Sequence, residues 1–357
     1  MKPLDGNAIV YCQGAFNTPN GKTAHGLVRF TRRYEILSVI DERYSGSDAG
    51  FILDAKEMGV PIVDSVETSL ETARRSGKTP THFVIGLAPD GGRLNERNRK
   101  DITNAITHGL NIDSGLHDFL SDDPAFMDLA RKHGITMRDI RKPPDRKYLH
   151  FFSGEIESVQ STRVAVLGTD SAVGKRTTAW KLVNGLQDRG FQTTMIGTGQ
   201  TAWLQGAEYG IILDSLVNDF VSGEIEHAIV RAWNEKKPRV MILEGQGSLL
   251  NPAYPGGFEL IAAGRPHCII LQHAPGRVDY DGFPGYAIHP LRNQIAAVEL
   301  ISEKPVVAVT MNHEGLGPDD IESARKRIHR ETKLPVIDPL VHSMDEVLDA
   351  ISPFLNI

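Results

Sequence analysis

The residues best suited to chemistry form a short loop near the middle of the chain. An apolar run, Arg163–Gly168, is followed by five residues, a second glycine at Gly174, and then Lys175. Loops of this kind turn successive backbone N–H groups toward one point beside a helix N-terminus, which makes a site for phosphate oxygens. The glycines permit the backbone angles, and the lysine adds a positive charge. A strand–helix turn that binds nothing is the alternative. The residues predicted to contact the phosphates are Gly168, Thr169, Ser171, Ala172, Val173, Gly174, Lys175, Arg176, Thr177 and Thr178.

The loop departs from the common phosphate-binding pattern in two ways. Five residues, rather than four, separate the glycines, and Arg176 stands where Ser or Thr normally holds Mg²⁺. Thr177 and Thr178 follow, but on a helix they point in other directions. A guanidinium in place of a magnesium ligand indicates phosphates neutralised by protein cations. We therefore predict no metal site, and a nucleotide whose phosphates anchor it without reacting.

A second segment supplies a carboxylate. The apolar run Arg239–Glu244 ends in an acid that is followed by Gly245 and Gly247. The carboxyl ends of parallel strands face the ligand crevice, so we expect Glu244 beside the loop. An acid that caps the next turn is the alternative. Together with Asp170 in the loop and His273 at the end of another apolar run, Glu244 is a candidate catalytic base. A histidine that is simply hydrogen-bonded in a loop is the alternative for His273.

These two segments resemble dethiobiotin synthetase. That family's loop also runs Gly-Thr-Asp and then Val-Gly-Lys with five residues between the glycines, and its later strand ends in Glu-Gly-x-Gly. The likeness covers the chain from about Arg163 onward. The matched residues are Gly168, Thr169, Asp170, Val173, Gly174, Lys175, Glu244, Gly245 and Gly247.

The whole chain resembles a narrower family, the D-glutamate N-acetyltransferases, formerly a domain of unknown function. Four segments carry that resemblance: Gly168–Thr178, Glu244–Gly247, Gln272–Arg277 and Tyr34–Asp41. The resemblance implies acetyl-CoA as donor and D-glutamate as acceptor, with the N-acetyl-D-glutamate passed to a further enzyme for breakdown. A D-amino acid substrate rests on the resemblance alone. Arg176 agrees with it, because coenzyme A carries a diphosphate and a 3′-phosphate and needs no metal at the reacting centre.

Two other functions stay open. One is a Mg-ATP-dependent ligase or kinase of dethiobiotin-synthetase type, in which Glu244 and Asp219 would hold the magnesium. The other is a non-catalytic nucleotide-binding regulatory protein. One fold hosts many chemistries, so the fold alone cannot choose among them.

Arginines are the expected clamps for the acceptor's carboxylates, because their fork matches two carboxylate oxygens. Arg277 and Arg292 follow strand ends in the second half, and Arg43 comes from the first half. Each of them taken singly also fits ordinary surface charge. The segment Gly276–Pro290 is rich in Gly, Tyr and Asp and could form an acceptor-binding loop.

The pattern of strands and helices expected around these residues indicates an α/β fold. Short apolar runs alternate with helical patterns along nearly the whole chain, and their near-continuous Val, Ile and Leu content indicates parallel strands covered on both faces. Mixed charge and Pro143-Pro144 mark a boundary. We expect a Rossmann-like domain over 1–145 and a phosphate-loop domain over 146–357. The expected strands are Ala8–Cys12, Glu35–Asp41, Val60–Asp64, His82–Leu87, Arg163–Gly168, Thr193–Gly197, Arg239–Glu244, His267–Gln272, Val306–Met311 and Pro335–Ile337.

Composition limits the partners. The 357 residues carry 39 Lys and Arg against 45 Asp and Glu, a net charge of −6, which argues against nucleic acid and anionic membranes as partners. Cys12 and Cys268 both lie in apolar runs, and no apolar stretch approaches the length needed to cross a bilayer. The N-terminal residues do not have the pattern expected of a secretion signal. We expect a cytoplasmic protein and, from related phosphate-loop enzymes, a homo-oligomer.

Overall fold

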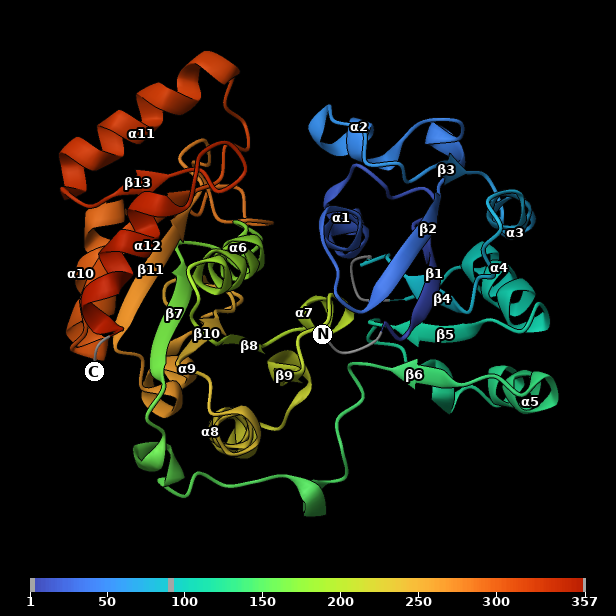
Figure 1. The fold of residues 1–357 in the computed structure, drawn as a ribbon, viewed down its shortest axis with the longest axis horizontal. Helices are drawn as coiled ribbons and strands as arrows, with labels where there is room; N and C mark the ends of the chain where they lie inside the picture. Colours follow the sequence, from blue (N-terminus) through green and yellow to red (C-terminus); the bar gives the residue numbers. More distant parts are fainter. Residues whose placement is uncertain (1–3, 89–92, 356–357) are drawn as a thin grey trace. The chain divides into compact units, whose positions relative to one another are not determined.

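The computed structural model describes residues 4–88 and 93–355, and its chain divides into two compact units (Figure 1). Unit 1 comprises Met1–Pro143 and Gln200–Gly206, and unit 2 comprises Pro144–Gly199 and Ala207–Ile357. The division after Pro143 falls two residues before the expected one. The sequence did not predict that Gln200–Gly206, from the second half of the chain, packs within unit 1.

Unit 1 is built on a six-stranded sheet in the order β3-β2-β1-β4-β5-β6, and every strand pair is parallel. This order is the one expected of a Rossmann-like domain. The strands are β1 (Gly6–Tyr11), β2 (Tyr34–Ile40), β3 (Ile62–Val63), β4 (His82–Ile85), β5 (Asn111–Ser114) and β6 (Met137–Asp139). The helices of unit 1 are α1 (Lys22–Arg29), α2 (Ala49–Asp54), α3 (Val66–Arg75), α4 (Glu96–Thr107), α5 (Pro124–His133) and α7 (Gln200–Leu204).

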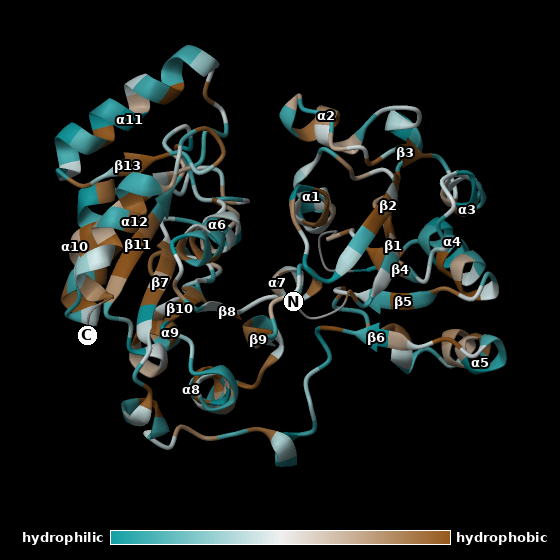
Figure 2. Ribbon diagram, in the orientation of Figure 1, coloured by the Kyte–Doolittle hydropathy of each residue, from teal (hydrophilic) through white to brown (hydrophobic). Residues whose placement is uncertain are grey.

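Unit 2 is built on a seven-stranded parallel sheet in the order β13-β12-β11-β7-β10-β8-β9. Its strands are β7 (Thr162–Gly168), β8 (Thr193–Gly197), β9 (Tyr209–Gly210), β10 (Val240–Glu244), β11 (Cys268–His273), β12 (Val306–Met311) and β13 (Val336–Ile337). Every residue of β7 and β10 is buried, and Figure 2 shows the central strands as hydrophobic. Strands buried on both faces lose the alternating pattern, which is why they appear in the sequence as continuous apolar runs. The predicted α/β class with two parallel sheets is confirmed.

The helices of unit 2 alternate with its strands. They are α6 (Lys175–Asp188), α8 (Asn218–Lys236), α9 (Phe258–Gly264), α10 (Leu291–Ser302), α11 (Pro318–Thr332) and α12 (Asp345–Ile351). In α11, Ala324 and Ile328 are the buried residues, one helical turn apart, and acids occupy its first turn. The pattern that predicts this helix in the sequence is therefore its narrow apolar stripe.

The sequence interpretation did not include strands β5, β6 and β9, nor helices α1 and α7 of unit 1. Strands β5 and β6 consist of Asn-Ile-Asp-Ser and Met-Arg-Asp, whose polar side chains hide the strand pattern, and β9 has two residues. Helix α1 follows the turn-forming segment Pro19–Gly21, which obscures its start. In the described part of the chain, no helix is long and apolar enough to span a membrane.

Candidate functional site

The phosphate loop, residues 168–178, lies where the strand order of unit 2 changes direction. After β7 the chain adds β8, β9 and β10 on one side of β7, and then returns to add β11 on the other side. Ligands of open α/β sheets bind at the carboxyl ends of the strands beside such a point. In the parallel register Gly168 is level with Gln272 of β11, and Val166 is level with Glu244 of β10. Three segments singled out in the sequence therefore meet at one edge.

The start of α6 gives the phosphate loop its anion-binding geometry. Gly174, with φ of +104°, is the N-cap residue, and the helix begins at Lys175. The N–H groups of a first helical turn have no partner within the helix and point toward the loop. A Cβ on Gly168 would lie 2.9 Å from the Cδ and Nζ atoms of Lys175, so the lysine can lie across the loop because this position is glycine. Ala172 adopts φ of +52° at the exposed tip.

Lys175 is folded onto the protein. Its side chain is buried, and Nζ donates to the carbonyl oxygens of Asp170 at 2.6 Å and Gly247 at 2.7 Å. Burial lowers the pKa of Lys175 to about 8, although the negative charges of Asp170 and Glu244 oppose that shift. Lys175 therefore links the phosphate loop to the Glu-Gly-x-Gly segment and is only partly charged just above neutral pH.

Glu244 is buried at the end of β10. Its Oε2 accepts the N–H of Thr198 at 2.9 Å, and the hydroxyl of Thr198 donates to the carbonyl oxygen of Glu244 at 3.0 Å. Burial raises the pKa of Glu244, and the charges of Arg176 and Lys175 act against that rise. The structure thus places a carboxyl group with a raised pKa near two cations of the phosphate loop, as the sequence predicted for its position.

Asp170 is fully buried, and its carboxylate is engaged by four donors. Oδ1 accepts from the Ser171 N–H at 2.7 Å and the Asn251 side chain at 2.8 Å. Oδ2 accepts from Arg277 at 2.9 Å and the Asp281 N–H at 2.8 Å. These bonds fasten the segments around Asn251 and Asp281 to the phosphate loop. The surroundings of Asp170 suit a residue that holds loops in place better than one that receives a substrate proton.

His273 lies at the end of β11, and its Nδ1 is 2.9 Å from the hydroxyl of Thr169. Burial, assisted by the charge of Arg327, lowers the pKa of His273 to about 4. The neighbouring Gln272 accepts the hydroxyl of Thr178 through Oε1 at 2.5 Å. Thr178 therefore packs into the protein, and His273 is a neutral, half-buried imidazole near neutral pH.

The three predicted carboxylate clamps lie in different surroundings. Arg277 reaches the site, where it bridges Asp170 and the exposed Glu314, the latter at 2.7 Å. Arg292 does not join this group; it lies exposed on α10 and donates to the carbonyl oxygen of Glu331 at 2.6 Å. Arg43 belongs to unit 1, where it bonds to Asp41 at 2.8 Å.

Some residues of this edge were missed by the sequence interpretation. Thr198 and Asn251 bond to Glu244 and Asp170, but nothing in their local pattern shows those long-range partners. His313 and Asp338 were also not predicted as site residues, although each lies just beyond the end of a predicted strand. Nδ1 of His313 is 2.6 Å from Oδ2 of Asp338. The residues that the structure describes contain no group of three or more His, Cys, Asp or Glu side chains that could hold a metal ion.

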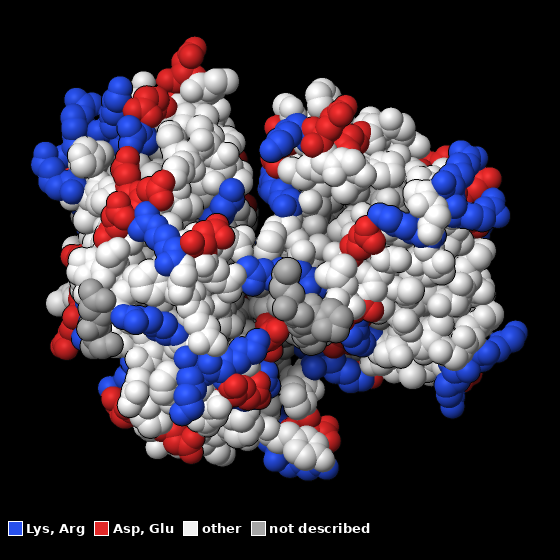
Figure 3. All heavy atoms as spheres, in the orientation of Figure 1, with Lys and Arg blue, Asp and Glu red and all other residues white. Residues whose placement is uncertain are grey.

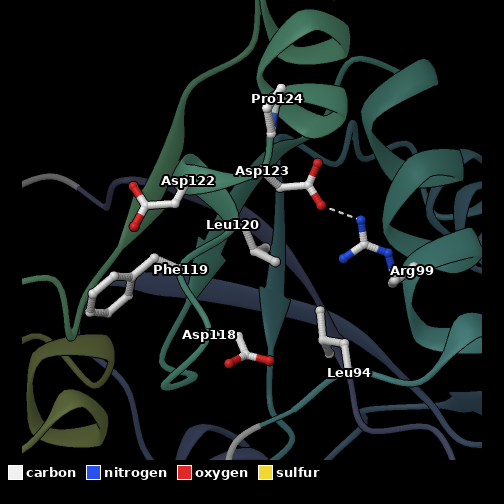
Figure 4. A pocket seen from close by; sticks show the side chains of 8 residues that line it. All are labelled: Leu94, Arg99, Asp118, Phe119, Leu120, Asp122, Asp123 and Pro124. Carbon is white, nitrogen blue, oxygen red and sulfur yellow. Dashed lines mark hydrogen bonds and ion pairs between the residues drawn. The ribbon is translucent and has the colours of Figure 1, made fainter.

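Within residues 4–88 and 93–355, two of the surface hollows lie away from the phosphate loop. The hollow of unit 1, about 460 Å³, is lined by acids that include Asp118 and Asp122, and its Arg99 is already paired with Asp123 (Figure 4). The other, about 390 Å³, is lined by basic side chains of α11, where Figure 3 shows positive residues gathering. Neither offers the combination of backbone donors, cation and carboxylate found at the phosphate loop.

Comparisons with known proteins cover both units. Residues 150–348 match a family described as DUF1611, a domain of unknown function, through its C-terminal P-loop domain, and residues 42–143 match its N-terminal Rossmann-like domain. A D-glutamate N-acetyltransferase from Tritonibacter scottomollicae is 30% identical over 292 residues, which cover 80% of this chain and 85% of that protein. A second protein of that name, from a Pseudoalteromonas species, is 30% identical over 285 residues, covering 78% of this chain and 82% of that protein.

A solved structure shares the fold over nearly the whole chain. The crystal structure of a DUF1611 family protein from Anabaena variabilis superimposes with a TM-score of 0.88 at 29% sequence identity. The match covers 97% of this chain and 99% of the other. Both units therefore have counterparts in one known protein.

Proposed function

This chain belongs to the DUF1611 family, and from that premise we propose that it is an N-acetyltransferase that moves the acetyl group of acetyl-CoA onto the amino group of D-glutamate. Two relatives that match about four-fifths of the chain carry the name D-glutamate N-acetyltransferase, which supports the choice of acceptor. The products are N-acetyl-D-glutamate and coenzyme A, and the former would pass to a further enzyme.

The observation that carries the donor assignment is the phosphate loop with Arg176 in the place of a magnesium ligand. Backbone N–H groups at the start of α6, together with Lys175 and Arg176, can neutralise a diphosphate without a metal ion. Coenzyme A needs only such an anchor, because its reacting sulfur is remote from its phosphates. In this proposal Lys175 exchanges its bonds to the Asp170 and Gly247 carbonyls for bonds to phosphate oxygens.

The acceptor's carboxylates require a cation at the same edge. Arg277 is held by Asp170, but its second contact is to Glu314, whose side chain is 53% exposed. A carboxylate of D-glutamate can replace that of Glu314 on the guanidinium with little change in geometry. Anchoring the acceptor in this way would bring its amine into line with the thioester carbonyl. The carbonyl oxygen, as it becomes an oxyanion, would be stabilised by N–H groups of the phosphate loop.

The experiment is an assay of thiol release from acetyl-CoA with D-glutamate, L-glutamate and a panel of other amino acids, run in EDTA. The proposal predicts D-glutamate-dependent thiol release that the chelator does not reduce. Thiol release no greater than that of a blank would overturn it. In a parallel assay with Mg-ATP in place of acetyl-CoA and without the chelator, consumption of ATP would instead favour the ligase or kinase. Nucleotide binding without turnover of any acceptor would favour a regulatory protein.

The catalytic roles predicted for Glu244, Asp170 and His273 can be separated by their conservative variants. Asp170→Asn would act mainly by loosening the loops that its carboxylate holds. His273→Gln would change activity little, because a pKa of about 4 makes the imidazole a weak base. Glu244→Gln would lower activity by removing the negative charge near Lys175 and Arg176. A larger loss in His273→Gln than in Glu244→Gln would reverse this ranking.

A further inference from the structure

A histidine–aspartate pair stands at the same edge of the unit 2 sheet as the phosphate loop. His313 lies two residues beyond β12, and Asp338 follows β13 directly. The two strands are parallel neighbours, so their carboxyl ends bring the side chains together. The Nδ1 atom of His313 is 2.6 Å from Oδ2 of Asp338.

The carboxylate of Asp338 is fixed and buried. It is 1% exposed, and Oδ1 accepts the N–H of Leu340 at 2.9 Å. Its own backbone N–H donates to Nδ1 of His342 at 3.0 Å. A buried carboxylate whose other oxygen is already bonded holds an imidazole in one orientation.

This arrangement determines which nitrogen of His313 can accept a proton. A carboxylate at Nδ1 keeps the hydrogen on that nitrogen, so the lone pair is on Nε2. The carboxylate also stabilises the imidazolium that forms when Nε2 is protonated. The His313 side chain is 36% exposed, so a ligand can reach it. His273, by contrast, has no carboxylate bonded to its ring in the part of the chain that the structure describes, and its Nδ1 lies 2.9 Å from the Thr169 hydroxyl.

The neighbours of His313 connect it to the phosphate loop. Glu314 binds Arg277, which in turn binds Asp170. On the other side, the N–H of Asn312 donates to the His273 carbonyl at 2.8 Å. The Asn312 side-chain nitrogen would lie 3.9 Å from a Cβ placed on Gly174. The pair is therefore part of the edge at which the donor's phosphates are proposed to bind.

We propose that His313, oriented by Asp338, is a catalytic residue that takes a proton from the ammonium group of the acceptor. This inference rests on the proposed function. The proton moves from the acceptor nitrogen to Nε2, and the freed lone pair forms the N–C bond at the thioester carbonyl. The C–S bond then breaks, and the leaving thiolate takes the second proton of the nitrogen. His313 returns its proton to solvent, so the sum is one amide, one thiol and one released proton.

Charged groups from several elements lie around the pair. They are His342 and Glu322, which are 3.7 Å apart, Arg325 on α11, Glu346 of α12, and on the side of the phosphate loop Glu314 and Arg277. The charges of both signs lie on several elements, so the pH test compares variants with the wild type and does not rely on one absolute pKa.

The test measures kcat at saturating acetyl-CoA and D-glutamate from pH 6.5 to pH 10 for the wild type, His313→Asn, Asp338→Asn and Glu244→Gln. General-base catalysis contributes on the order of 10²–10⁴-fold, so His313→Asn should lose about 100-fold or more near pH 7. The deficit should shrink as pH rises, because a growing fraction of the acceptor amine deprotonates in solution. Asp338→Asn should show a smaller loss of the same form. His329→Asn, on the exposed face of α11, is the matched control and should follow the wild type.

The affinity for acetyl-CoA and the thermal midpoint, which a general folding defect would change, should be the same in His313→Asn and the wild type. A raised KM for acetyl-CoA with unchanged kcat would overturn the inference and make the pair part of the donor site. A pH-dependent deficit in Glu244→Gln, with none in His313→Asn, would return the role to Glu244. A wild-type protein that releases no thiol would overturn the proposed function itself, whereas an active wild type matched by His313→Asn overturns this inference alone.

Discussion

Among single residues, the buried lysine of the phosphate loop matters most for the proposed binding of acetyl-CoA. To bind phosphate as proposed, Lys175 must be charged, but burial lowers its pKa to about 8 in the unliganded protein. Above that pH the lysine must take up a proton before it can bind, so the dissociation constant of acetyl-CoA should rise by up to about tenfold per pH unit. Calorimetric titrations from pH 7 to pH 9.5 in EDTA measure this slope.

The matched control for the lysine is Lys175→Arg, which stays charged across the whole range. Whatever the magnitude of its affinity for acetyl-CoA, that affinity should not change with pH. An equal slope in both proteins, or a flat wild type, would contradict the role given to Lys175. Lys175→Ala should bind acetyl-CoA at least tenfold more weakly than the wild type at pH 7.

Residues whose place depends on local geometry could be predicted from the sequence. Residues whose place depends on partners far along the chain could not. Gly168, Gly174 and Lys175 form a local pattern, and the structure puts them at the predicted strand–helix junction. The hydrogen bond between Asp170 and Arg277 joins residues that are 107 positions apart, and the sequence near either residue does not predict it. The placement of His313 and Asp338 near the phosphate loop could have been predicted, because each comes just after a predicted parallel strand.

At the scale of elements, the segment after β10 needs glycine at position 247. Its φ is +47°, and a Cβ there would lie 1.9 Å from the carbonyl oxygen of Tyr254. Gly247→Ala should therefore shift the segment, break the bond that Lys175 makes to the Gly247 carbonyl, and destabilise the fold by about 1–3 kcal/mol. Thermal unfolding and acetyl-CoA titration should both show the defect.

Gly317→Ala is the control for this substitution. Gly317 is the N-cap residue of α11 with φ of −72°, and a Cβ there would lie 3.3 Å from the Asp320 side chain. The small clash falls on an exposed side chain, so stability and affinity should stay close to those of the wild type. Equal defects in the two variants would show that the geometry at Gly247 is not special.

The carboxylate of Asp170 ties the phosphate loop to the segments around Asn251 and Asp281, so its removal should destabilise all three. Asp170→Asn leaves Arg277, 13% exposed, without its buried counter-charge, and breaking such a pair costs roughly 3–5 kcal/mol. Adding Arg277→Met to Asp170→Asn should recover part of that loss, because the charge left unpaired is then removed. Denaturant titrations of the two single variants and the double variant measure the coupling. Purely additive losses would contradict the tie between the loops.

At the scale of the whole molecule, the chain enters unit 1 twice. Gln205 of the returning segment donates to the carbonyls of Gly26 and Phe30 at 2.7 and 2.8 Å, and Leu204 is fully buried in the core of unit 1. The guanidinium of Arg33 lies 3.7 Å from the Trp203 ring centre. The sequence interpretation divided the chain once, because a seven-residue helical segment cannot be assigned to a domain without its contacts.

The packing of residues 200–206 within unit 1 predicts the stability of fragments of this unit. Residues 1–143 alone leave the Leu204 and Trp203 sites open, so the fragment should be markedly less stable than one in which a flexible linker appends residues 200–206. The appended segment should raise the thermal midpoint by several degrees, since burying one leucine is worth about 1.5–3 kcal/mol. A linked segment with Leu204→Ser and Trp203→Ser should restore little. Equal midpoints for all three fragments would contradict the assignment of the segment to unit 1.

A crystal structure with acetyl-CoA bound in the presence of EDTA would show whether residues 168–178 anchor the diphosphate of a coenzyme A donor. We expect diphosphate oxygens within hydrogen-bond distance of the backbone N–H groups at the start of α6, with the Lys175 ammonium turned toward them and Arg176 beside them. A diphosphate bound to other residues, with Lys175 still bonded to the carbonyls of Asp170 and Gly247, would contradict this proposal.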